Sequence, residues 1–349
     1  MATTYYANTT ILEARSLLTV ENQKKFELRP VITRVAEAFM RSANAAIVNL
    51  SNIKQAIQQT TKVIYHKNKA FTINSSRSNT PTGEVSSTGI STITWYEKNF
   101  RVTDSSKLFQ NNEVDRNTAL AVNLWNAEKS FWESLDENVL VAFLESNKST
   151  VNDGDGYDGT LASGNMAINA DDVDRFYNIV GGHMMLNDFE APFMDLHSSY
   201  WKSKQQYYAA QGAGNNTNLA FQFAGFEHFP SNKITPASST YISKHYIIPV
   251  GGIAMVTWNN PDNRSGKVHA NARLFTVESI FYPGIYFDVY AYDTWGDTSS
   301  GGSGEITGDI QDATTVFEYT LHYANWTHPF TESGQTAIFR YDNKKTVVI

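Results

Sequence analysis

Alternating carboxylates in a glycine-rich stretch are the first candidate for chemistry in this sequence. Residues 152–158 spell Asn-Asp-Gly-Asp-Gly-Tyr-Asp, which matches the opening of a calcium-binding loop, where such oxygens converge on a hard cation. Tyr157 stands where an oxygen ligand is required, and Gly164 stands where an EF-hand needs a bidentate Glu. We therefore interpret the stretch as a Gly/Asp turn and not as a calcium site.

Two further motifs match known catalytic or cofactor patterns only in part. Ser199 and Lys202 have the S-x-x-K spacing of serine acyl-enzymes, but no S-D-N or K-T-G segment follows, and aromatic neighbours indicate a helix face. Gly212 and Gly214 lack the third glycine of a dinucleotide-binding loop and follow a predicted helix, whereas that loop must follow a strand. Neither motif predicts an active site.

The histidines and the Asn-x-Ser/Thr triplets also lack a functional pattern. Eight histidines are present, and none forms an H-E-x-x-H motif or a paired metal spacing, so each is interpreted as a core or surface residue: His66, His183, His197, His228, His245, His269, His322 and His328. Triplets such as those at Asn74 and Asn325 are interpreted as accidental in an Asn-rich chain. We expect no catalytic, cofactor-binding or metal-binding residues, no cofactor, and no enzyme activity.

Composition excludes several classes of function. The 349 residues include no cysteine, which excludes disulfides and thiolate chemistry. The net charge is −7, and no Lys/Arg block is present, which argues against tight binding to nucleic acid. No apolar run reaches eighteen residues, so no membrane span is predicted, and the N-terminus has no secretory signal. Aromatic residues make up 13% of the chain, which suits broad β-rich surfaces between subunits.

One long predicted helix is the element against which the others are expected to pack. Asn112 to Asn147 contains no Gly and no Pro, and its apolar residues recur at steps of three and four, which predicts one long helix. Leu124, Phe131 and Leu135 are expected on its buried face, whereas Glu128 is expected to point mostly away from it. So long a helix requires other parts of the chain to lie along it.

The preceding residues predict an arm, a helix and a hairpin. Met1 to Leu28 is polar and weakly periodic, which predicts an extended arm with one short helix. Pro30 suits the first turn of a helix that continues to about Gln59. Lys62 to Val102 predicts a long hairpin with Val63, Tyr65, Phe71 and Ile73 on one face, and with a polar tip from Ser75 to Gly89.

The remainder of the chain predicts an α/β middle and a β-rich end. The expected elements are a helix from Ala170 to Val180 that ends at Gly181-Gly182, a helix from Phe193 to Ala210, strands at Leu219–Phe223, at Tyr246–Trp258 (a broken pair), at Val268–Ile280, at Ile285–Tyr292 and around Thr315–Tyr323, and a final short strand pair at Ala337–Tyr341 and Thr346–Ile349. No internal repeat is present.

This order of parts resembles the major capsid (coat) protein of tailed bacteriophages, whose fold is shared with encapsulin shells. The sequence around Gln211-Gly-Ala-Gly-Asn-Asn-Thr-Asn, followed by Ser231-Asn232, is also similar to phage coat sequences. The resemblance implies an α+β fold with these parts: an N-terminal arm (1–28), an N-terminal helix (29–59), an E-loop hairpin (60–103), the spine helix of the P-domain (104–150), an A-domain (151–266), and P-domain and C-terminal strands (267–349).

The resemblance also implies a function. The chain is expected to be a non-enzymatic structural protein of the virion that assembles in the host bacterial cytoplasm with copies of itself. Hexamers and pentamers of the icosahedral shell would enclose the genome, with weak non-specific contact to packaged DNA. A separate scaffolding protein is expected because the arm begins almost at Met1, and a portal is expected as a further partner. Some family members cross-link a hairpin Lys to a neighbour, but nothing identifies the partners of Lys62, Lys67, Lys69 or Lys98.

Two other functions stay open at this stage. One is another virion or tail component or a double-jelly-roll coat, although a long helix early in the chain argues against jelly rolls. The other is a carbohydrate-binding or hydrolysing β-rich protein, as the many Trp and Tyr residues suggest. A glycosidase would need a cleft with two suitably separated carboxylates.

Overall fold

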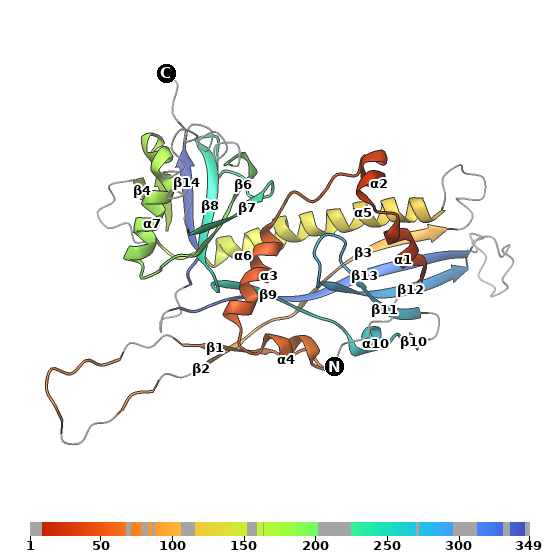
Figure 1. Ribbon diagram of the computed structural model, residues 1–349, viewed down its shortest axis with the longest axis horizontal. Helices are drawn as coiled ribbons and strands as arrows, with labels where there is room; N and C mark the ends of the chain where they lie inside the picture. The colour runs from red at the N-terminus through yellow and green to blue at the C-terminus, as the bar shows by residue number, and fades with distance from the viewer. Residues whose placement is uncertain are drawn as a thin grey trace, which may run out of the picture.

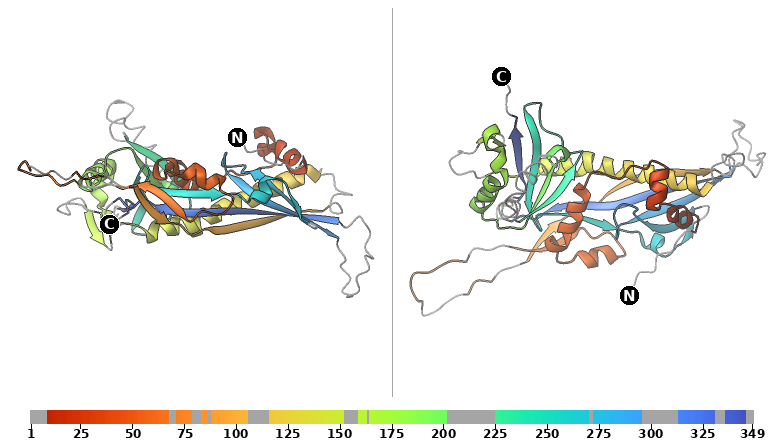
Figure 2. Two further views of the ribbon diagram at one scale, coloured as in Figure 1. Left: turned by 90° about the horizontal axis from the view of Figure 1, so that it is seen from below. Right: turned by 45° about the horizontal axis from the view of Figure 1, so that its top comes forward.

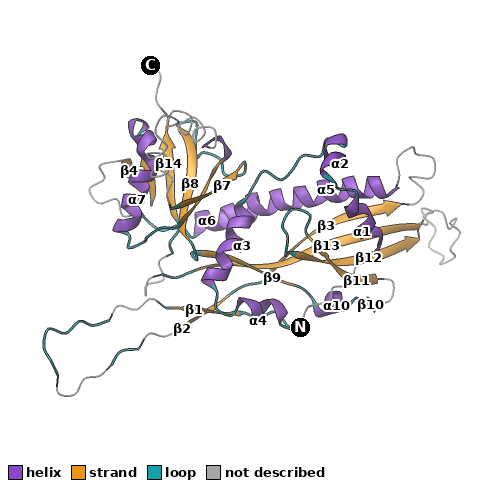
Figure 3. Ribbon diagram, in the orientation of Figure 1, coloured by secondary structure: helices purple, strands orange, loops and turns teal. Residues whose placement is uncertain are grey.

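The predicted α+β class is confirmed, because helices and antiparallel-rich sheets both form large parts of the molecule (Figure 3). The computed structural model describes residues 9–67, 71–78, 83–85, 88–105, 116–151, 159–162, 164–201, 225–269, 272–295, 313–330 and 336–345. Within these ranges, no helix combines the length and the apolar character that crossing a lipid bilayer requires.

One helical run lies along the length of the molecule (Figure 1). It consists of three segments with no loop between them: α5 (Arg116–Leu135), a π-helical turn (Asp136–Leu140) and α6 (Val141–Ser146). We call residues 116–146 the spine helix. The predicted single helix is confirmed over this range, whereas residues 112–115 lie outside the described part of the chain. The predicted face is confirmed too, because Leu124, Phe131 and Leu135 are buried.

A six-stranded antiparallel sheet lies against the spine helix. In chain order its strands are β3 (Tyr96–Ser105), β9 (Ile253–Trp258), β10 (Val268–His269), β11 (Ala272–Glu278), β12 (Tyr286–Trp295) and β13 (Ala313–Thr327). The longest strand, β13, pairs with β12 and β3 and then, near its end, with β9. The short helix α10 (Pro261–Arg264) packs near β11. The strands predicted at Ile285–Tyr292 and around Thr315–Tyr323 are thereby confirmed, whereas the strand predicted at Val268–Ile280 is divided into β10 and β11, which pair with each other.

Aromatic side chains fill the space between the spine helix and this first sheet. The Phe131 ring lies 5.5 Å from that of Phe100 and 5.3 Å from that of Phe287. Phe100 in turn stacks on Tyr319 at 4.8 Å. Large aromatic side chains bury the most area per residue and dominate the energetics of such cores. The long helix is therefore held by its packing on the sheet rather than by helix propensity alone.

A second six-stranded sheet stands at one end of the spine helix (Figures 1 and 2). Its strands are β4 (Gly159–Ala162), β5 (Asn165–Ile168), β6 (Phe193–Ser198), β7 (Phe226–Ser231), β8 (Tyr241–Pro249) and β14 (Phe339–Lys344), in the order β4-β5-β14-β8-β6-β7. The 3₁₀ helix η3 (Ala170–Arg175) and α7 (Phe176–Leu186) pack on one face. The broken strand pair predicted at Tyr246–Trp258 is present, but its halves, β8 and β9, belong to different sheets.

The predicted helix from Phe193 to Ala210 is wrong at its start. Residues 193–198 form β6, residues 199–201 are helical, and residues 202–224, which include the strand predicted at 219–223, lie outside the described residues. Every residue of β6 is buried, because both faces of the sheet are covered. Phe193, Leu196 and Tyr200 also lie at helical spacing, so the sequence of this strand satisfies a helical period as well.

Two other predicted boundaries differ from the structure. α7 does not end at Gly181-Gly182, because both glycines continue the helix and a Cβ at either would meet no atom within 4 Å. It ends after Leu186, where Asn187 donates to the His183 carbonyl at 2.7 Å. Of the predicted C-terminal pair, the first strand corresponds to β14, which lies between β8 and β5, and the second, at 346–349, lies outside the described part.

The sheets also divide the chain differently from the predicted boundary between residues 266 and 267. β9 precedes that boundary and yet pairs with β13 in the first sheet. β14 follows the boundary and yet pairs with β8 and β5 in the second sheet. Pairing between strands so far apart in the sequence cannot be predicted from the residues of either strand. Dividing the chain at one position therefore assigned β9 and β14 to the wrong sheets.

The N-terminal region has more helices, and shorter ones, than predicted. They are α1 (Thr9–Ser16), α2 (Val20–Lys25), α3 (Val35–Ala46) and α4 (Leu50–Gln55). The arm is thus not extended over its described part, and Ile11 and Ala14 are fully buried in the main core. The predicted helix from Pro30 to Gln59 is interrupted between α3 and α4, because residues there form hydrogen bonds with β1 (Lys62–His66). Val48 donates to the Ile64 carbonyl at 3.0 Å, and Asn49 accepts from the Ile64 amide at 2.9 Å.

Buried carboxylates on the spine helix hold other segments in place. Glu128, expected on the polar side, is 3% exposed and accepts from the Ile280 amide at 2.8 Å and from Trp132 Nε1 at 3.2 Å. Asp136 accepts from the amides of Val35 and Ala36, both at 3.2 Å. These are the first amides of α3, so a residue one hundred positions away caps that helix. This explains why α3 begins at Val35 and not near Pro30.

We expect Phe131→Pro to lower the free energy of unfolding by at least ~3 kcal/mol, because proline removes a helical hydrogen bond and clashes with the preceding turn. Phe131→Leu serves as the control, since it keeps an apolar side chain and the helical backbone. Urea unfolding followed by circular dichroism measures both. Equal stability of the two variants would mean that the helix tolerates a break at this position.

A second prediction concerns pH. Burial raises the pKa of Asp136 from the usual 3.8 to about 7, although Thr33 and the α3 amides act in the opposite direction. The folded state then binds more protons than the unfolded state, so this contribution to stability is complete below about pH 4 and is lost as the pH rises through 7. Asp136→Asn keeps an acceptor oxygen without the ionisation.

We therefore expect the stability of Asp136→Asn relative to the native chain to increase between pH 4 and pH 8. Urea unfolding at a series of pH values measures this difference. Asp171→Asn, at an exposed position on η3, controls for the loss of one carboxylate. A relative stability of Asp136→Asn that does not change with pH would contradict the prediction.

Candidate functional site

The hairpin that projects from the body of the molecule is the first candidate. β1 pairs with β2 (Thr88–Thr92) in a two-stranded antiparallel ribbon, and β3 follows as part of the first sheet. We call residues 62–92 the ribbon. Figure 1 shows its described residues extending away from both sheets. The predicted hairpin is confirmed in outline, although its return strand is divided between β2 and β3.

The base of the ribbon is anchored in the body of the molecule. Val63 is fully buried, and Tyr65 is 7% exposed, with its ring 5.5 Å from that of Trp326 on β13. The Tyr65 ring lies over its strand partner Gly89, where a Cβ would come within 2.2 Å of it. Only glycine leaves room for the ring at this position. Two of the four residues predicted on one face of the hairpin, Val63 and Tyr65, are therefore covered by the molecule itself.

Beyond this base, the ribbon exposes apolar side chains. Phe71 is 50% exposed, Ile73 90% and Val85 80%, and at the base itself Ile90, opposite Ile64, is 66% exposed. Phe71, Ile73 and Val85 lie in the loop beyond β1 and β2, and soluble monomers rarely expose several large apolar side chains close together on one narrow projection. The ribbon therefore has the properties of a contact surface.

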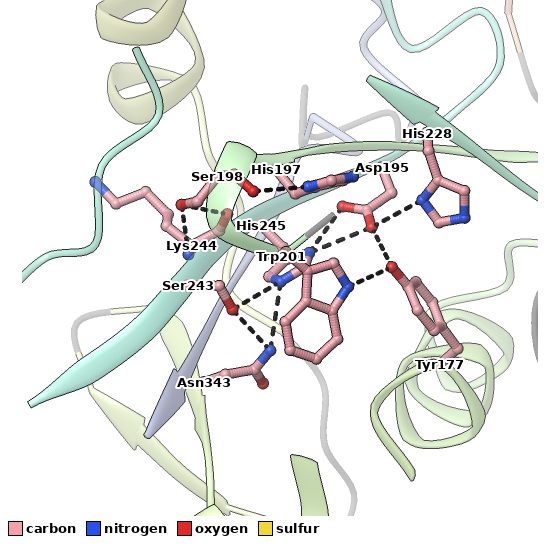
Figure 4. Close-up of polar contacts among 10 residues, drawn as sticks. All are labelled: Tyr177, Asp195, His197, Ser198, Trp201, His228, Ser243, Lys244, His245 and Asn343. Atoms are coloured by element: carbon pink, nitrogen blue, oxygen red, sulfur yellow. Dashed lines mark hydrogen bonds and ion pairs between the residues drawn. The ribbon is translucent and has the colours of Figure 1, made fainter. Parts of the chain in front are cut away.

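A second candidate lies on the face of the second sheet that α7 covers. Asp195 and His197 are two residues apart on β6 and so point to the same face. In the strand register, Asp195 lies beside His228 on β7, and His197 lies beside His245 on β8. One potential ligand atom from each of Asp195, His197 and His228 lies within 4.8 Å of the others. We call these four residues the Asp–His cluster (Figure 4).

Asp195 is the centre of the cluster. Its carboxylate is fully buried and accepts from the Tyr177 hydroxyl at 2.8 Å and from His245 Nδ1 at 2.9 Å. His228 Nδ1 lies 3.5 Å away. Burial alone would raise the pKa of Asp195, but the surrounding histidines and hydrogen bonds hold it well below its usual value. The carboxylate is therefore ionised at neutral pH.

The ring of His197 is oriented by its own strand. Its Nδ1 lies 2.9 Å from the Ser198 carbonyl oxygen, which can only accept, so Nδ1 carries the proton and Nε2 carries the lone pair. Burial lowers the pKa of His197 to about 4, so the ring is neutral at pH 7. Among the described residues, Nε2 is buried and has no hydrogen-bond partner. This leaves a buried acceptor atom beside an ionised carboxylate.

Ser243, His245 and Asp195 have the connectivity of a hydrolase triad. Ser243 Oγ lies 3.0 Å from His245 Nε2, and His245 Nδ1 contacts Asp195. However, Ser243 and His245 are fully buried, and Asn343 Nδ2 donates to Ser243 Oγ at 3.0 Å. A nucleophile must reach a substrate carbonyl. This hydroxyl is enclosed by the protein, so the arrangement does not support acyl transfer.

No protein-family model and no curated protein matches this chain. Its structure is similar to a chain titled "Microbacterium phage Oxtober96", with 11% identity over 97% of this chain and 100% of that chain and a TM-score of 0.47. A chain titled "Mycobacterium phage Cain" is 13% identical over 99% of this chain and 100% of that chain, with a TM-score of 0.46. A chain titled "Capsid of Ralstonia phage GP4" is 9% identical over 83% of this chain and 85% of that chain, with a TM-score of 0.42.

The motifs considered in the sequence mostly fall outside the described residues. This holds for the calcium-like stretch 152–158, for Lys202 of the S-x-x-K match, and for the glycines at 212 and 214. Three of the eight histidines lie together. His197, His228 and His245 come together in the cluster, whereas His183 stacks on Tyr341 and His66 is exposed.

The Asp–His cluster is the feature that sequence reasoning missed. Residues 195 and 197 point in different directions on a helix and in one direction on a strand, so predicting a helix there separated them. The available signal was the alternation of Asp195 and His197, repeated in Ser243 and His245. The register between β6, β7 and β8 is set by pairing of distant segments. It cannot be predicted from the spacing of residues within one segment.

The cluster generates a prediction about stability. Tyr177→Phe removes the hydroxyl that donates to Asp195 and accepts from Trp201 Nε1 at 2.7 Å. Leaving buried polar groups without partners costs about 1–3 kcal/mol, and we expect a loss of this size in urea unfolding. Tyr319→Phe is the matched control, because within the described structure that buried hydroxyl has no hydrogen-bond partner. Equal losses in the two variants would contradict the assigned network.

Proposed function

We propose that this chain is a structural subunit of an icosahedral bacteriophage capsid, which assembles with copies of itself into hexamers and pentamers around the genome. The observation that carries the proposal is the ribbon, because its base is fixed to the subunit while Phe71, Ile73 and Val85 remain exposed. A two-stranded ribbon is marginal in water by itself. A neighbouring subunit that covers these side chains would remove that exposure.

The remaining properties of the chain agree with a container. A net charge of −7 suits a shell that encloses DNA without binding it tightly, so contact with packaged DNA would be weak and non-specific. We further propose that a separate scaffolding protein and a portal take part in assembly, that assembly occurs in the bacterial cytoplasm, and that the subunit is not an enzyme. Buried area per subunit should then exceed the roughly 1,600 Å² of one standard pairwise interface.

Sedimentation velocity and negative-stain microscopy of the purified chain test this function. Capsomers or closed shells are the expected result. A compact monomer at all concentrations, in buffers that promote association, would contradict the proposal and favour a carbohydrate-binding or other monomeric role.

The ribbon supplies a sharper test. We expect the double variant Phe71→Ser/Ile73→Ser to keep its helices, because neither side chain belongs to a buried core cluster. Burying one such side chain contributes about 1.5–3 kcal/mol, so the loss of two per contact should weaken subunit association by at least about tenfold. Far-UV circular dichroism and sedimentation measure the two quantities separately.

Thr72→Ser on the same ribbon is the matched control, since it changes a polar side chain between the two apolar ones. We expect this variant to assemble like the native chain. Normal shells formed at the normal rate by the double variant would show that the ribbon has no role in assembly. Loss of helical signal in the double variant would place the ribbon in the subunit's own core instead.

A further inference from the structure

The Asp–His cluster has the donor set of a metal site. Two imidazoles and one carboxylate, from residues on the neighbouring strands β6 and β7, converge within 4.8 Å. Nitrogen and carboxylate ligands of this kind suit divalent transition metals, whereas Ca²⁺ and Mg²⁺ prefer sites made of oxygen atoms alone. The chain contains no cysteine, so no thiolate competes for the ion.

The orientation of His197 meets a requirement for a ligand. Metal-binding histidines usually donate their second ring N–H to a carbonyl or a carboxylate, which fixes the tautomer and aims the other nitrogen at the metal. His197 does this through Nδ1 and the Ser198 carbonyl. Figure 4 shows its ring between that carbonyl and Asp195. Nε2 is buried and, among the described residues, has no hydrogen-bond partner, and a bound cation would satisfy it.

The separation of the other two ligands agrees with this arrangement. His228 Nδ1 and Asp195 Oδ2 are 3.5 Å apart. Two ligands of a tetrahedral ion with bonds of ~2.1 Å lie about 3.4 Å apart. The pair is thus spaced as two ligands of one ion are spaced.

A second layer of hydrogen bonds holds the carboxylate. Asp195 accepts from Tyr177, whose hydroxyl accepts from Trp201, and from His245, whose Nε2 faces Ser243 and Asn343. Such outer contacts orient metal-binding carboxylates and are part of a functional metal site. His245 belongs to this layer, because its Nδ1 is engaged by the carboxylate and its Nε2 by other residues.

We propose that Asp195, His197 and His228 bind one divalent transition-metal ion of the Zn²⁺ class in each subunit, with water in the remaining coordination. The ion joins β6 to β7 at the edge of the second sheet and so stabilises that sheet. It binds the folded state only, because the unfolded chain does not bring the two strands together. This inference does not depend on the proposed capsid function.

The test uses the full-length chain after treatment with a chelator and dialysis. Isothermal titration with Zn²⁺ should give one site per subunit, and added Zn²⁺ should raise the unfolding temperature. Co²⁺ should give visible absorption bands of nitrogen and oxygen ligation, without the charge-transfer bands of thiolate ligands. His228→Gln should weaken Zn²⁺ binding at least tenfold, and so should the isosteric Asp195→Asn. His66→Gln, at an exposed position outside the cluster, should bind like the native chain.

His228 is partly exposed, at 25% of its side chain, so its replacement is expected to leave the fold intact, and circular dichroism checks this. Absence of Zn²⁺ binding by the native chain would overturn the proposal. Binding that is equal in the native chain, His228→Gln and Asp195→Asn would overturn it as well, because the ion would then lie elsewhere. Loss of binding in His66→Gln alone would assign the ion to the base of the ribbon and not to the cluster.

Discussion

The packing of Phe131 against Phe100 and Phe287 joins the spine helix to the first sheet, and the other elements are placed relative to this contact. α1 lies against α5, and Ile11 belongs to the same core cluster. One face of the second sheet reaches the same cluster through Leu196 and Phe229. This cluster thus connects the arm, the spine helix and both sheets, whereas the other face of the second sheet packs against α7 in a second cluster and the base of the ribbon belongs to a third.

Polar contacts then determine where individual segments begin and end within that core. Asp136 caps α3 from the π-helical turn of the spine helix, and Glu128 holds the chain at Ile280. Buried carboxylates of this kind contribute specificity more than net stability, because removing them from water is costly. The ribbon has the opposite character. Its base is held by Tyr65 over Gly89, and the described apolar residues beyond the base, Phe71, Ile73 and Val85, are exposed.

The features that could be predicted from the sequence are those with a long local period. The spine helix has a sustained helical period without Gly or Pro, and β13 alternates through Phe317, Tyr319 and Leu321. The errors have a common physical origin in contacts between distant segments. The cap from Asp136, the pairing of Val48 with β1 and the burial of β6 on both faces each override local preference. The Asp–His cluster stayed hidden for the same reason, since its members meet only through strand register.

The pairing of β3 with β13 also determines when the subunit can be completed during synthesis. Arg101 and Glu318 are direct partners in this ladder although they are 217 residues apart. At a translation rate of about 5–20 residues per second, β3 waits roughly 10–40 s on the ribosome for its partner strand. During that interval the apolar face of α5 has no first sheet to cover it. That face therefore stays exposed to water on the nascent chain until β12 and β13 have been synthesised.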